Sequence, residues 1–444
     1  MAMKVEIVSR DVIKPSSPTP ENQRLYKLSF LDQFAPAIYT PTLLFYSTYR
    51  GDQDVQNHSK LVADKTQRLK MSLSETLTQF YPLAGRVKDN SVIECNDEGA
   101  EFLEAKVNCF LSDILKQPDE YSMNLFLPIE VESPKAGLSP LLLIQANFFK
   151  CGGLAIGISI SHKIADGSTI STFIKGWSMI ANGCTYEEAT HPSYVLGDIY
   201  PSLDFPITLP SCELRKGKCI TTRYVFSASK IAELKAQAAS TFVERPTRVE
   251  AVLALLWKSA TMAARAKFGS NRPTVLSQLV NIRKRLNPPL PENSIGNLLG
   301  IFAVQEDGRE IGLQCLVVQL RKGLDEYSNV DVKKLQQGHA FNAICEAFQK
   351  VENHLNNYGV DLFACTSLCK FGFYDANFGW GRPKWVTFSM LRVKNAVILM
   401  DASDGEGIEA LLTLSEEEMA LVEKNEELLQ FASVNPSIIA CTST

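Results

Sequence analysis

A histidine and an aspartate stand four residues apart in segment 161–167, SHKIADG. An imidazole titrates near neutral pH, so His162 could take a proton from an alcohol as that alcohol attacks an electrophile. Asp166 could orient the imidazole, or it could pin the loop by pairing with a basic residue. The alternative interpretation is a histidine that only satisfies its hydrogen bonds within a loop, because HxxxD spacings arise by chance. The segment therefore predicts a general base at His162 and leaves the role of Asp166 open.

The elements on either side of this segment are typical of a rigid support. Residues 154–161 alternate in a pattern that predicts a strand with one aliphatic face, and the turn at 150–153 joins this strand to the apolar run 141–149 as a hairpin. Ser168 is placed to cap a helix that ends at Gly183. The histidine therefore lies in a strand-to-helix connection, where catalytic groups are commonly held.

A second unusual segment is 377–381, NFGWG, near the C-terminus. Gly379 and Gly381 permit positive φ, so the backbone can bend sharply around the indole of Trp380. Taken alone, the segment also fits a tight turn with an aromatic anchor.

The pattern along the rest of the chain predicts an α/β fold with mixed sheets. The length of 444 residues suggests two domains. Periodicity fades and prolines cluster between 183 and 222, which indicates an interdomain crossover. We therefore expect one domain at 1–190 with the HxxxD segment, a crossover at 191–222, and a second domain at 223–444 with the NFGWG segment.

Several elements of the second half have clear boundary signals. Thr247 and Glu250 form the pattern of a capping box for a helix that runs to about Lys267, and Ser415 and Glu418 repeat the pattern. Strands are expected at about 274–282, 362–368, 384–391, 396–401 and 407–414, with two helices within 312–358.

Composition limits the partners and the location. The net charge of −4 and a pI near 5.9 argue against a nucleic-acid binder or a polybasic membrane binder. No run of 18 apolar residues is present, so we expect no membrane span, and the N-terminus lacks a signal peptide pattern. The 11 cysteines are scattered without zinc-ligand spacing, so we expect reduced thiols and a cytoplasmic protein.

Taken together, these motifs give the chain its resemblance to the plant BAHD acyltransferase family, closest to the vinorine synthase-like branch. Besides HxxxD and the DFGWG-like segment, the matching stretches are 13–15 (IKP), 31–33 (LDQ), 80–86 (FYPLAGR), 247–251 (TRVEA), 280–283 (VNIR) and 404–407 (DGEG). The resemblance covers essentially the whole chain. It implies two chloramphenicol-acetyltransferase-like domains with mixed sheets flanked by helices and an active-site channel between them.

The resemblance also implies roles for individual residues. His162 matches the family's general base, and Asp166 matches an aspartate that points away from substrate and pairs with an arginine matching Arg283. The family reaction proceeds in a ternary complex without a metal, a bound cofactor or an acyl-enzyme, and acyl-CoA is a co-substrate. By the same match, Gly167 and the segment Asn377, Phe378, Gly379, Trp380 and Gly381 are expected to support coenzyme A binding.

Nucleophilic catalysis by Ser161 or Cys151 is not favoured. Neither residue lies in a G-x-S-x-G elbow, and adjacent strand residues face opposite ways. The candidates for the donor that stabilises the oxyanion are the Trp380 indole N–H and a backbone N–H.

One position departs from the family pattern, because Asn377 stands where the motif has aspartate. We expect this residue to cap its turn, so that the loss of charge has little effect.

The expected function is transfer of an acetyl or other short aliphatic acyl group to a hydroxyl of an alkaloid, terpenoid, sugar ester or quinone alcohol, by a monomer. N-acylation of an amine and a non-catalytic ligand-binding homologue are the alternatives.

Overall fold

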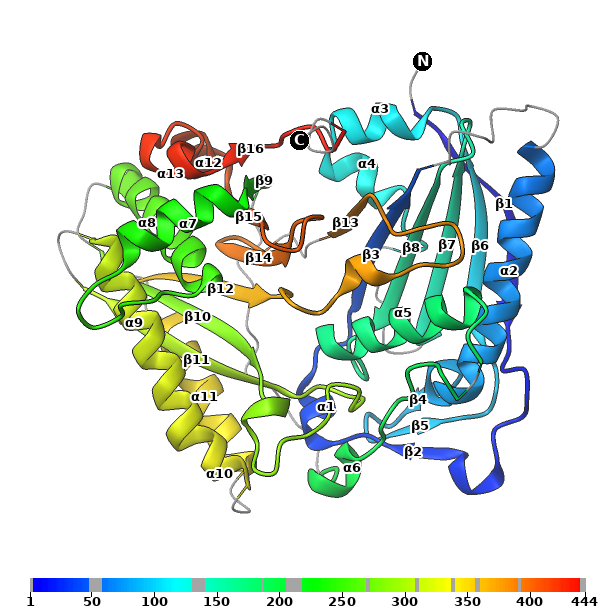
Figure 1. Ribbon diagram of the computed structural model, residues 1–444. Helices are drawn as coiled ribbons and strands as arrows, with labels where there is room; N and C mark the ends of the chain where they lie inside the picture. The colour runs from blue at the N-terminus through cyan, green and yellow to red at the C-terminus, as the bar shows by residue number, and fades with distance from the viewer. Residues whose placement is uncertain are drawn as a thin grey trace.

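The computed structural model describes residues 3–47, 58–129, 140–185, 187–204, 218–268, 272–307, 311–336, 340–355, 360–389 and 393–439. Two sheet-rich halves stand side by side, the N-terminal half in blue and cyan and the C-terminal half mainly in green and yellow (Figure 1). The fold is mixed α/β, as the alternation of strand and helix patterns predicted.

The first half is organised around a six-stranded sheet with helices against both faces. Strands β6 and β7 are parallel, and all other neighbours are antiparallel. Helices α2 and α5 pack together on one face, where Trp177 Nε1 of α5 donates to Ser72 Oγ of α2 at 3.0 Å. In order across the sheet, the strands are β1 (Val5–Ile13), β6 (Ala100–Val107), β7 (Leu142–Phe149), β8 (Leu154–Ser161), β3 (Tyr39–Tyr46) and β13 (Trp385–Phe388). The helices are α2 (His58–Gln79), α5 (Gly167–Ala181), α3 (Leu111–Lys116) and α4 (Glu120–Asn124).

The central hairpin of this sheet is more buried than its alternation suggested. Every residue of β7 and of β8 is buried, because α2 and α5 cover one face while α3 and residues around Phe126 cover the other. The rigid strand β8 therefore ends at Ser161 deep inside the molecule, directly before His162.

The second half holds a seven-stranded sheet. The strands in order are β11 (Leu299–Glu306), β10 (Thr274–Asn281), β12 (Asp361–Ser367), β14 (Ala396–Asp401), β15 (Ile408–Ser415), β9 (Cys219–Phe226) and β16 (Ser433–Val434). The helices are α7 (Ala228–Ala238), α8 (Arg248–Phe268), α9 (Leu313–Glu326), α10 (Val332–Gln336), α11 (Ala340–Leu355), α12 (Glu416–Val422) and α13 (Glu426–Phe431), with a π-helix at Tyr327–Asp331. The expected capping box at Thr247 is complete, since Thr247 N donates to Glu250 Oε2 and Glu250 N donates to Thr247 Oγ1. At Ser415 only the N-cap half forms: Glu418 N donates to Ser415 Oγ, while the Glu418 side chain accepts from Ser415 Oγ and not from the Ser415 N–H.

Near the bottom of Figure 1 lie two short helices, which pack into the core of the second half, and a small sheet, which packs into the core of the first half. The helices are α1 (Phe30–Phe34) and α6 (Leu196–Ile199), and the small sheet is made of β2 (Leu25–Lys27), β5 (Val92–Glu94) and β4 (Arg86–Lys88). Single 3-10 turns occupy Glu21–Gln23, Tyr81–Ala84, Arg283–Arg285 and Phe373–Asp375. Of the crossover expected at 191–222, residues 205–217 lie outside the described residues, and β9 begins within it at Cys219.

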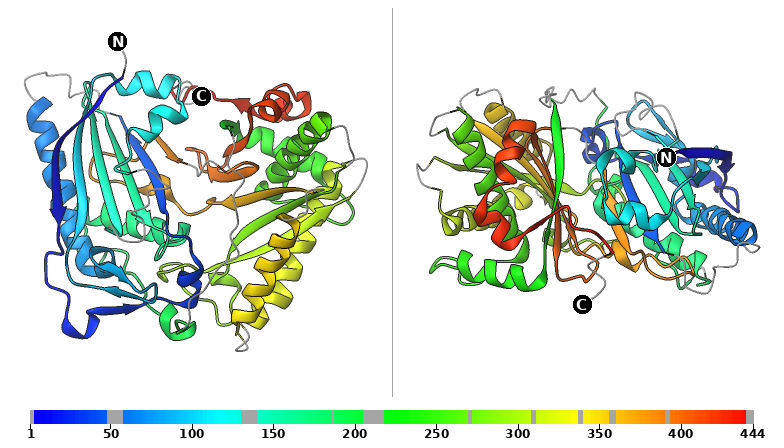
Figure 2. Two further views of the ribbon diagram at one scale, coloured as in Figure 1. Left: turned by 180° about the vertical axis from the view of Figure 1, so that it is seen from behind. Right: turned by 90° about the horizontal axis from the view of Figure 1, so that it is seen from above.

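The second half of the chain also supplies one edge of the first sheet. Strand β13 pairs antiparallel with β3, with Trp385 opposite Phe45, and lies beside it in the view from above (Figure 2). Its Val386 and Phe388 join the same core as Phe378 and the helices α2 and α5. The two halves are therefore joined by sheet hydrogen bonds.

No helix in the described residues combines the length and hydropathy needed to cross a bilayer.

Candidate active site

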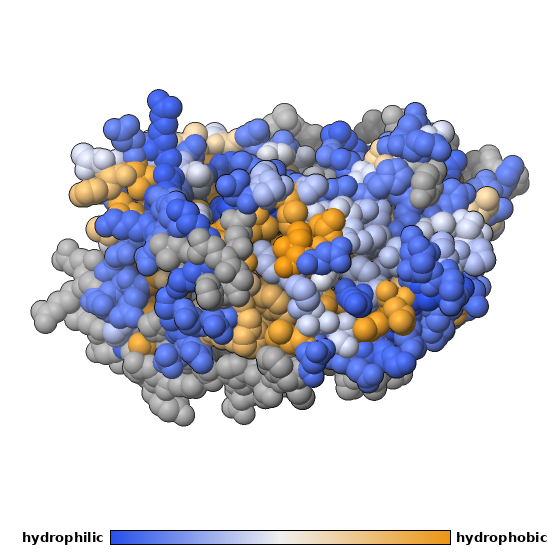
Figure 3. Space-filling model, turned by 90° about the horizontal axis from the view of Figure 1, so that it is seen from below, coloured by the Kyte–Doolittle hydropathy of each residue, from blue (hydrophilic) through white to orange (hydrophobic). Residues whose placement is uncertain are grey.

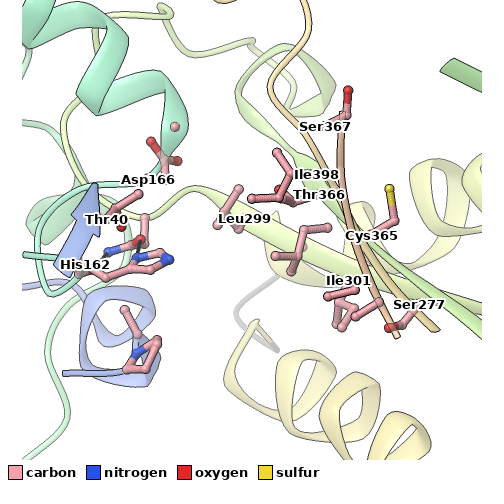
Figure 4. A pocket seen from close by; sticks show the side chains of 18 of the residues that line it. Thr40, His162, Asp166, Ser277, Leu299, Ile301, Cys365, Thr366, Ser367 and Ile398 are labelled. Atoms are coloured by element: carbon pink, nitrogen blue, oxygen red, sulfur yellow. Dashed lines mark hydrogen bonds between the residues drawn. The ribbon is translucent and has the colours of Figure 1, made fainter. Parts of the chain in front are cut away.

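A cavity of about 720 Å³ lies between the two halves. The first half contributes Thr40, His162 and Asp166 to one wall, and strands β10, β11, β12 and β14 of the second half form the wall opposite (Figure 4). Residues of α1 and α11 close the remaining sides. His162 therefore stands where the two halves meet, at the edge of a mainly apolar space.

His162 is fixed by backbone hydrogen bonds on both sides of the β8 terminus. Its N–H donates to Ile38 O at 2.9 Å, and the preceding Ser161 N–H donates to Leu141 O at 2.8 Å. These bonds extend the β3–β8 and β7–β8 ladders by one residue each, so the imidazole projects from an almost rigid support.

The side chain of Asn297 determines which imidazole nitrogen holds the proton. Asn297 Nδ2 donates to Asp32 Oδ1 at 2.9 Å and to the His162 carbonyl at 2.7 Å, which orients the amide. Asn297 Oδ1 then faces His162 Nδ1 at 2.9 Å and can only accept. In the neutral ring the proton therefore resides on Nδ1, and Nε2 keeps its lone pair.

Burial lowers the pKa of His162 below its usual 6.5, because desolvation penalises the charged imidazolium. The hydrogen bond with Asn297 and the charge of Asp166 act in the opposite direction and are weaker. The ring is therefore neutral at pH 7, with one nitrogen able to accept a proton from a hydroxyl.

Asp32 supports this arrangement from behind. Its side chain is fully buried and accepts from Ser29 N, Ser29 Oγ, Asn297 N and Asn297 Nδ2 at 2.6–3.0 Å. Burial still raises its pKa above 3.8. Asp32 also completes a capping box with Ser29 at the start of α1, so one carboxylate fixes both a helix end and the orienting amide.

Asp166 points away from the reacting ring toward Arg283. Arg283 Nη1 and Nη2 donate to Asp166 Oδ2 and Oδ1 at 2.7 and 3.1 Å, and both side chains are 0% exposed. Asp166 also accepts from Leu298 N at 3.1 Å, and Arg283 donates to the carbonyls of Ser294 and Gly296. The pair therefore holds the HxxxD loop against segment 294–298, which includes Asn297.

The expected helix cap at Ser168 is wrong. Asp166 is the N-cap of α5, because its Oδ1 accepts from Thr169 N at 2.9 Å and the helix begins at Gly167. Ser168 Oγ donates instead to the Glu292 carbonyl at 3.0 Å. Because the helix already begins at Gly167, Ser168 lies within its first turn. Asp166 occupies the N-cap position, from which its carboxylate can accept from the free N–H groups.

Gly167 lines the cavity at a point of close packing. A Cβ on this residue would lie 2.6 Å from Leu368 Cδ2, so a larger residue would require the Leu368 side chain to move.

The NFGWG segment lies apart from the cavity. Asn377 Oδ1 accepts from Gly379 N at 3.0 Å and from Gly381 N at 2.9 Å, and both glycines have φ near +98°. Phe378 stacks on Trp380 and contacts Trp177 of α5. None of the five residues is among those that line the cavity.

The structure does not support Trp380 as the oxyanion donor. Its ring packs against Tyr46, and Lys65 Nζ lies 5.5 Å from the ring centroid. Trp380 is not among the residues that line the cavity with His162.

Ser161 and Cys151 form no pair with His162. Ser161 Oγ accepts from Lys163 N, and Cys151 Sγ at the far end of β8 accepts from Leu111 N. The described residues contain no group of three or more His, Cys, Asp or Glu that could hold a metal ion.

Two residues at this site escaped the sequence analysis. Asn297 gave no signal, because its partner His162 is 135 residues away. Asp32 appeared only within the matching stretch LDQ, although a carboxylate among the apolar residues of a short helix was a usable sign.

Comparisons with known proteins concern the whole chain and its fold. A family model described as "Transferase family" matches residues 3–429. Akuammiline synthase 1 of Alstonia scholaris is 39% identical over 437 residues, covering 98% of this chain and 99% of the relative. An epi-neemfruitin B 7-O-acetyltransferase of Melia azedarach is 38% identical, covering 98% and 100%. The crystal structure of vinorine synthase superposes with a TM-score of 0.82 at 32% identity, covering 97% of this chain and 99% of that one.

Proposed function

The chain belongs to the Transferase family of acyl-CoA-dependent acyltransferases, the BAHD enzymes, and from this premise we propose that it acylates a hydroxyl. The donor is acetyl-CoA or another short aliphatic acyl-CoA, used as co-substrate without a bound cofactor. The acceptor is a plant specialised metabolite: an alkaloid, a terpenoid, a sugar ester or a quinone alcohol. We further propose a cytoplasmic monomer built from the units 1–190, 191–222 and 223–444.

The observation that supports this proposal is the protonation and tautomeric state of the His162 imidazole at the cavity. A neutral imidazole with its proton on Nδ1 leaves Nε2 as a base on the edge of a cavity large enough for a drug-sized molecule. A general base at the edge of a cavity between the two halves fits direct transfer in a ternary complex.

The reaction would follow from this base. Nε2 takes the proton of the acceptor hydroxyl while its oxygen forms a bond to the thioester carbonyl carbon. The tetrahedral intermediate collapses by breaking the carbon–sulfur bond, and the imidazolium returns the proton to the leaving thiolate. Products are the ester and free coenzyme A, and His162 is neutral again.

The remaining site residues act indirectly in this proposal. Asp166 and Arg283 keep the loop in place. They form a buried ion pair with each other, so neither side chain is free to contact substrate. Gly167 permits the close approach of Leu368, and the segment Asn377 to Gly381 buttresses α2 and α5 and supports coenzyme A binding from a distance.

The test is a coenzyme A release assay on purified protein, with mass spectrometry of the product from a plant metabolite extract. We expect thiol release matched by a new ester, and His162→Ala should reduce it by about 10²–10⁴. His191→Ala is the matched control, because His191 is not among the lining residues, and it should keep full activity. Activity of His162→Ala above a tenth of the wild-type kcat would refute the base assignment. An amide product would show N-acylation.

A further inference from the structure

The cavity wall has a distinctive charge balance. Seen from below, apolar residues gather near the middle of the molecule, where the two halves meet, within a mainly hydrophilic surface (Figure 3). Inside, the wall facing His162 consists of apolar and neutral polar side chains, including Leu299, Ile301, Ile398 and Thr366 (Figure 4). Among the described lining residues, only His162, Asp166 and Lys394 are ionisable apart from tyrosine and cysteine.

None of these charged groups is available to a ligand cation. Both Asp166 oxygens are occupied by Arg283, Thr169 N and Leu298 N, and the side chain is fully buried. Lys394 Nζ lies 2.8 Å from Glu418 Oε2, and its charge has the wrong sign for an ammonium ion. Hence no carboxylate on the described part of the wall can act as a counter-ion.

The other polar side chains of the described wall are neutral, and several are bonded within the protein, among them Ser277, Asn281 and Ser389. Thr40 Oγ1 has no hydrogen-bond partner among the described residues, and it lies beside His162 (Figure 4). Asn395 Oδ1 is likewise buried without a partner and belongs to a lining residue. Neither oxygen is open to a water-sized molecule, so a polyol on this wall would leave several hydroxyls unpaired.

We propose that the acceptor is a neutral, largely apolar polycyclic alcohol, of terpenoid or steroid type, and that a protonated amine is excluded. This deepens the proposed function and rests on it. An ammonium ion taken from water into this cavity would lose its hydration without gaining an ion pair. A rigid apolar skeleton gains from burial against the same wall and loses little conformational freedom.

The test compares two probes of the same shape. One is a tetracyclic 3-hydroxysteroid, and the other is the corresponding azasteroid with a tertiary ring amine, which is protonated at pH 7. Binding to the wild type is measured by titration calorimetry, and transfer from acetyl-CoA is measured as kcat/KM. We expect the neutral steroid to bind at least about tenfold more tightly and to be the better substrate.

A charged wall residue provides the second arm. Leu299 is half-buried in the protein and faces the cavity. Leu299→Asp should shift the ratio of affinities toward the azasteroid by about tenfold or more, while the neutral control Leu299→Asn should leave the ratio unchanged. Leu299→Asp introduces a carboxylate, the counter-ion that the described part of the natural wall lacks.

The outcomes separate this inference from the proposed function. Binding of the neutral steroid without transfer would overturn the proposed function and leave the selectivity standing. Equal or tighter binding of the azasteroid to the wild type, or no binding of either probe, would overturn the inference. So would equal ratios in Leu299→Asp and Leu299→Asn.

Discussion

Asn297→Ala tests whether an amide, rather than the HxxxD aspartate, controls the catalytic histidine. The substitution removes the acceptor at 2.9 Å from His162 Nδ1 and both donors that orient it. The backbone N–H of residue 297 still donates to Asp32, so Asp32 loses only one of its donors. We expect the free energy of unfolding to fall by about 1–3 kcal/mol.

The catalytic cost follows from the charge that develops on the ring. His162 becomes an imidazolium as it takes the proton, and its Nδ1–H bond to Asn297 is then a bond from a charged donor. Such bonds are worth about 1.5–3 kcal/mol, and 1.36 kcal/mol is tenfold in rate, so kcat/KM should fall about 10- to 150-fold.

The pH profile distinguishes this role from a merely structural one. The Asn297 hydrogen bond raises the pKa of His162, so its loss should lower that pKa further. Activity requires the neutral ring and is lost as pH falls through this pKa, so the acidic limb of kcat/KM should move to lower pH. Asn293→Ala is the control, because Asn293 Nδ2 donates to the His191 carbonyl and does not bond His162. A loss of less than twofold with an unchanged acidic limb would refute the reasoning.

Three further predictions concern the base and the two motifs. The acidic limb of wild-type kcat/KM should lie below pH 6.5, because burial lowers the pKa of His162, and a limb above pH 7 in a pH–rate profile would contradict this. Asp166→Asn and Arg283→Gln should each lower the free energy of unfolding by about 3–5 kcal/mol, and their effects should add less than fully in a double-mutant cycle measured by chemical denaturation. Lys284→Gln, at an exposed neighbouring residue, is the control. Full additivity would argue against coupling between Asp166 and Arg283. Asn377→Asp should change stability by about 1 kcal/mol or less and leave kcat unchanged, because a carboxylate oxygen can also accept from Gly379 N and Gly381 N, so a large change in a thermal shift or kcat would exclude simple turn capping.

Local signals in the sequence predicted local structure well. The capping pattern at Thr247 and Glu250 predicted the start of α8, and strand β14 has its predicted bounds, Ala396–Asp401, in a continuous apolar run. Both depend on residues within a few positions of one another, so the information is complete in one stretch of chain.

Contacts between distant segments were beyond such signals. Pairing of β13 with β3 joins residues more than 300 positions apart, and no pattern in the run 384–391 indicated which strand it would pair with. The same holds for Asn297, which no spacing relates to His162. The arginine at position 283 entered only through the family resemblance, because a buried arginine gives no pattern of its own in the sequence.

The site keeps its base neutral because the aspartate and the amide have different partners. In a Ser-His-Asp arrangement a carboxylate accepts from Nδ1 and favours the imidazolium. Here Asp166 is directed to Arg283, and the neutral Asn297 amide holds Nδ1 instead. The resting ring therefore gains little from protonation, which agrees with the lowered pKa of His162. Arg283 donates to the Ser294 and Gly296 carbonyls, and Asp166 accepts from Leu298 N, so the ion pair holds the segment that contains Asn297. The pair therefore positions Asn297 as well as the HxxxD loop. Loss of the pair should therefore disturb the base through Asn297, even though neither charge touches the ring.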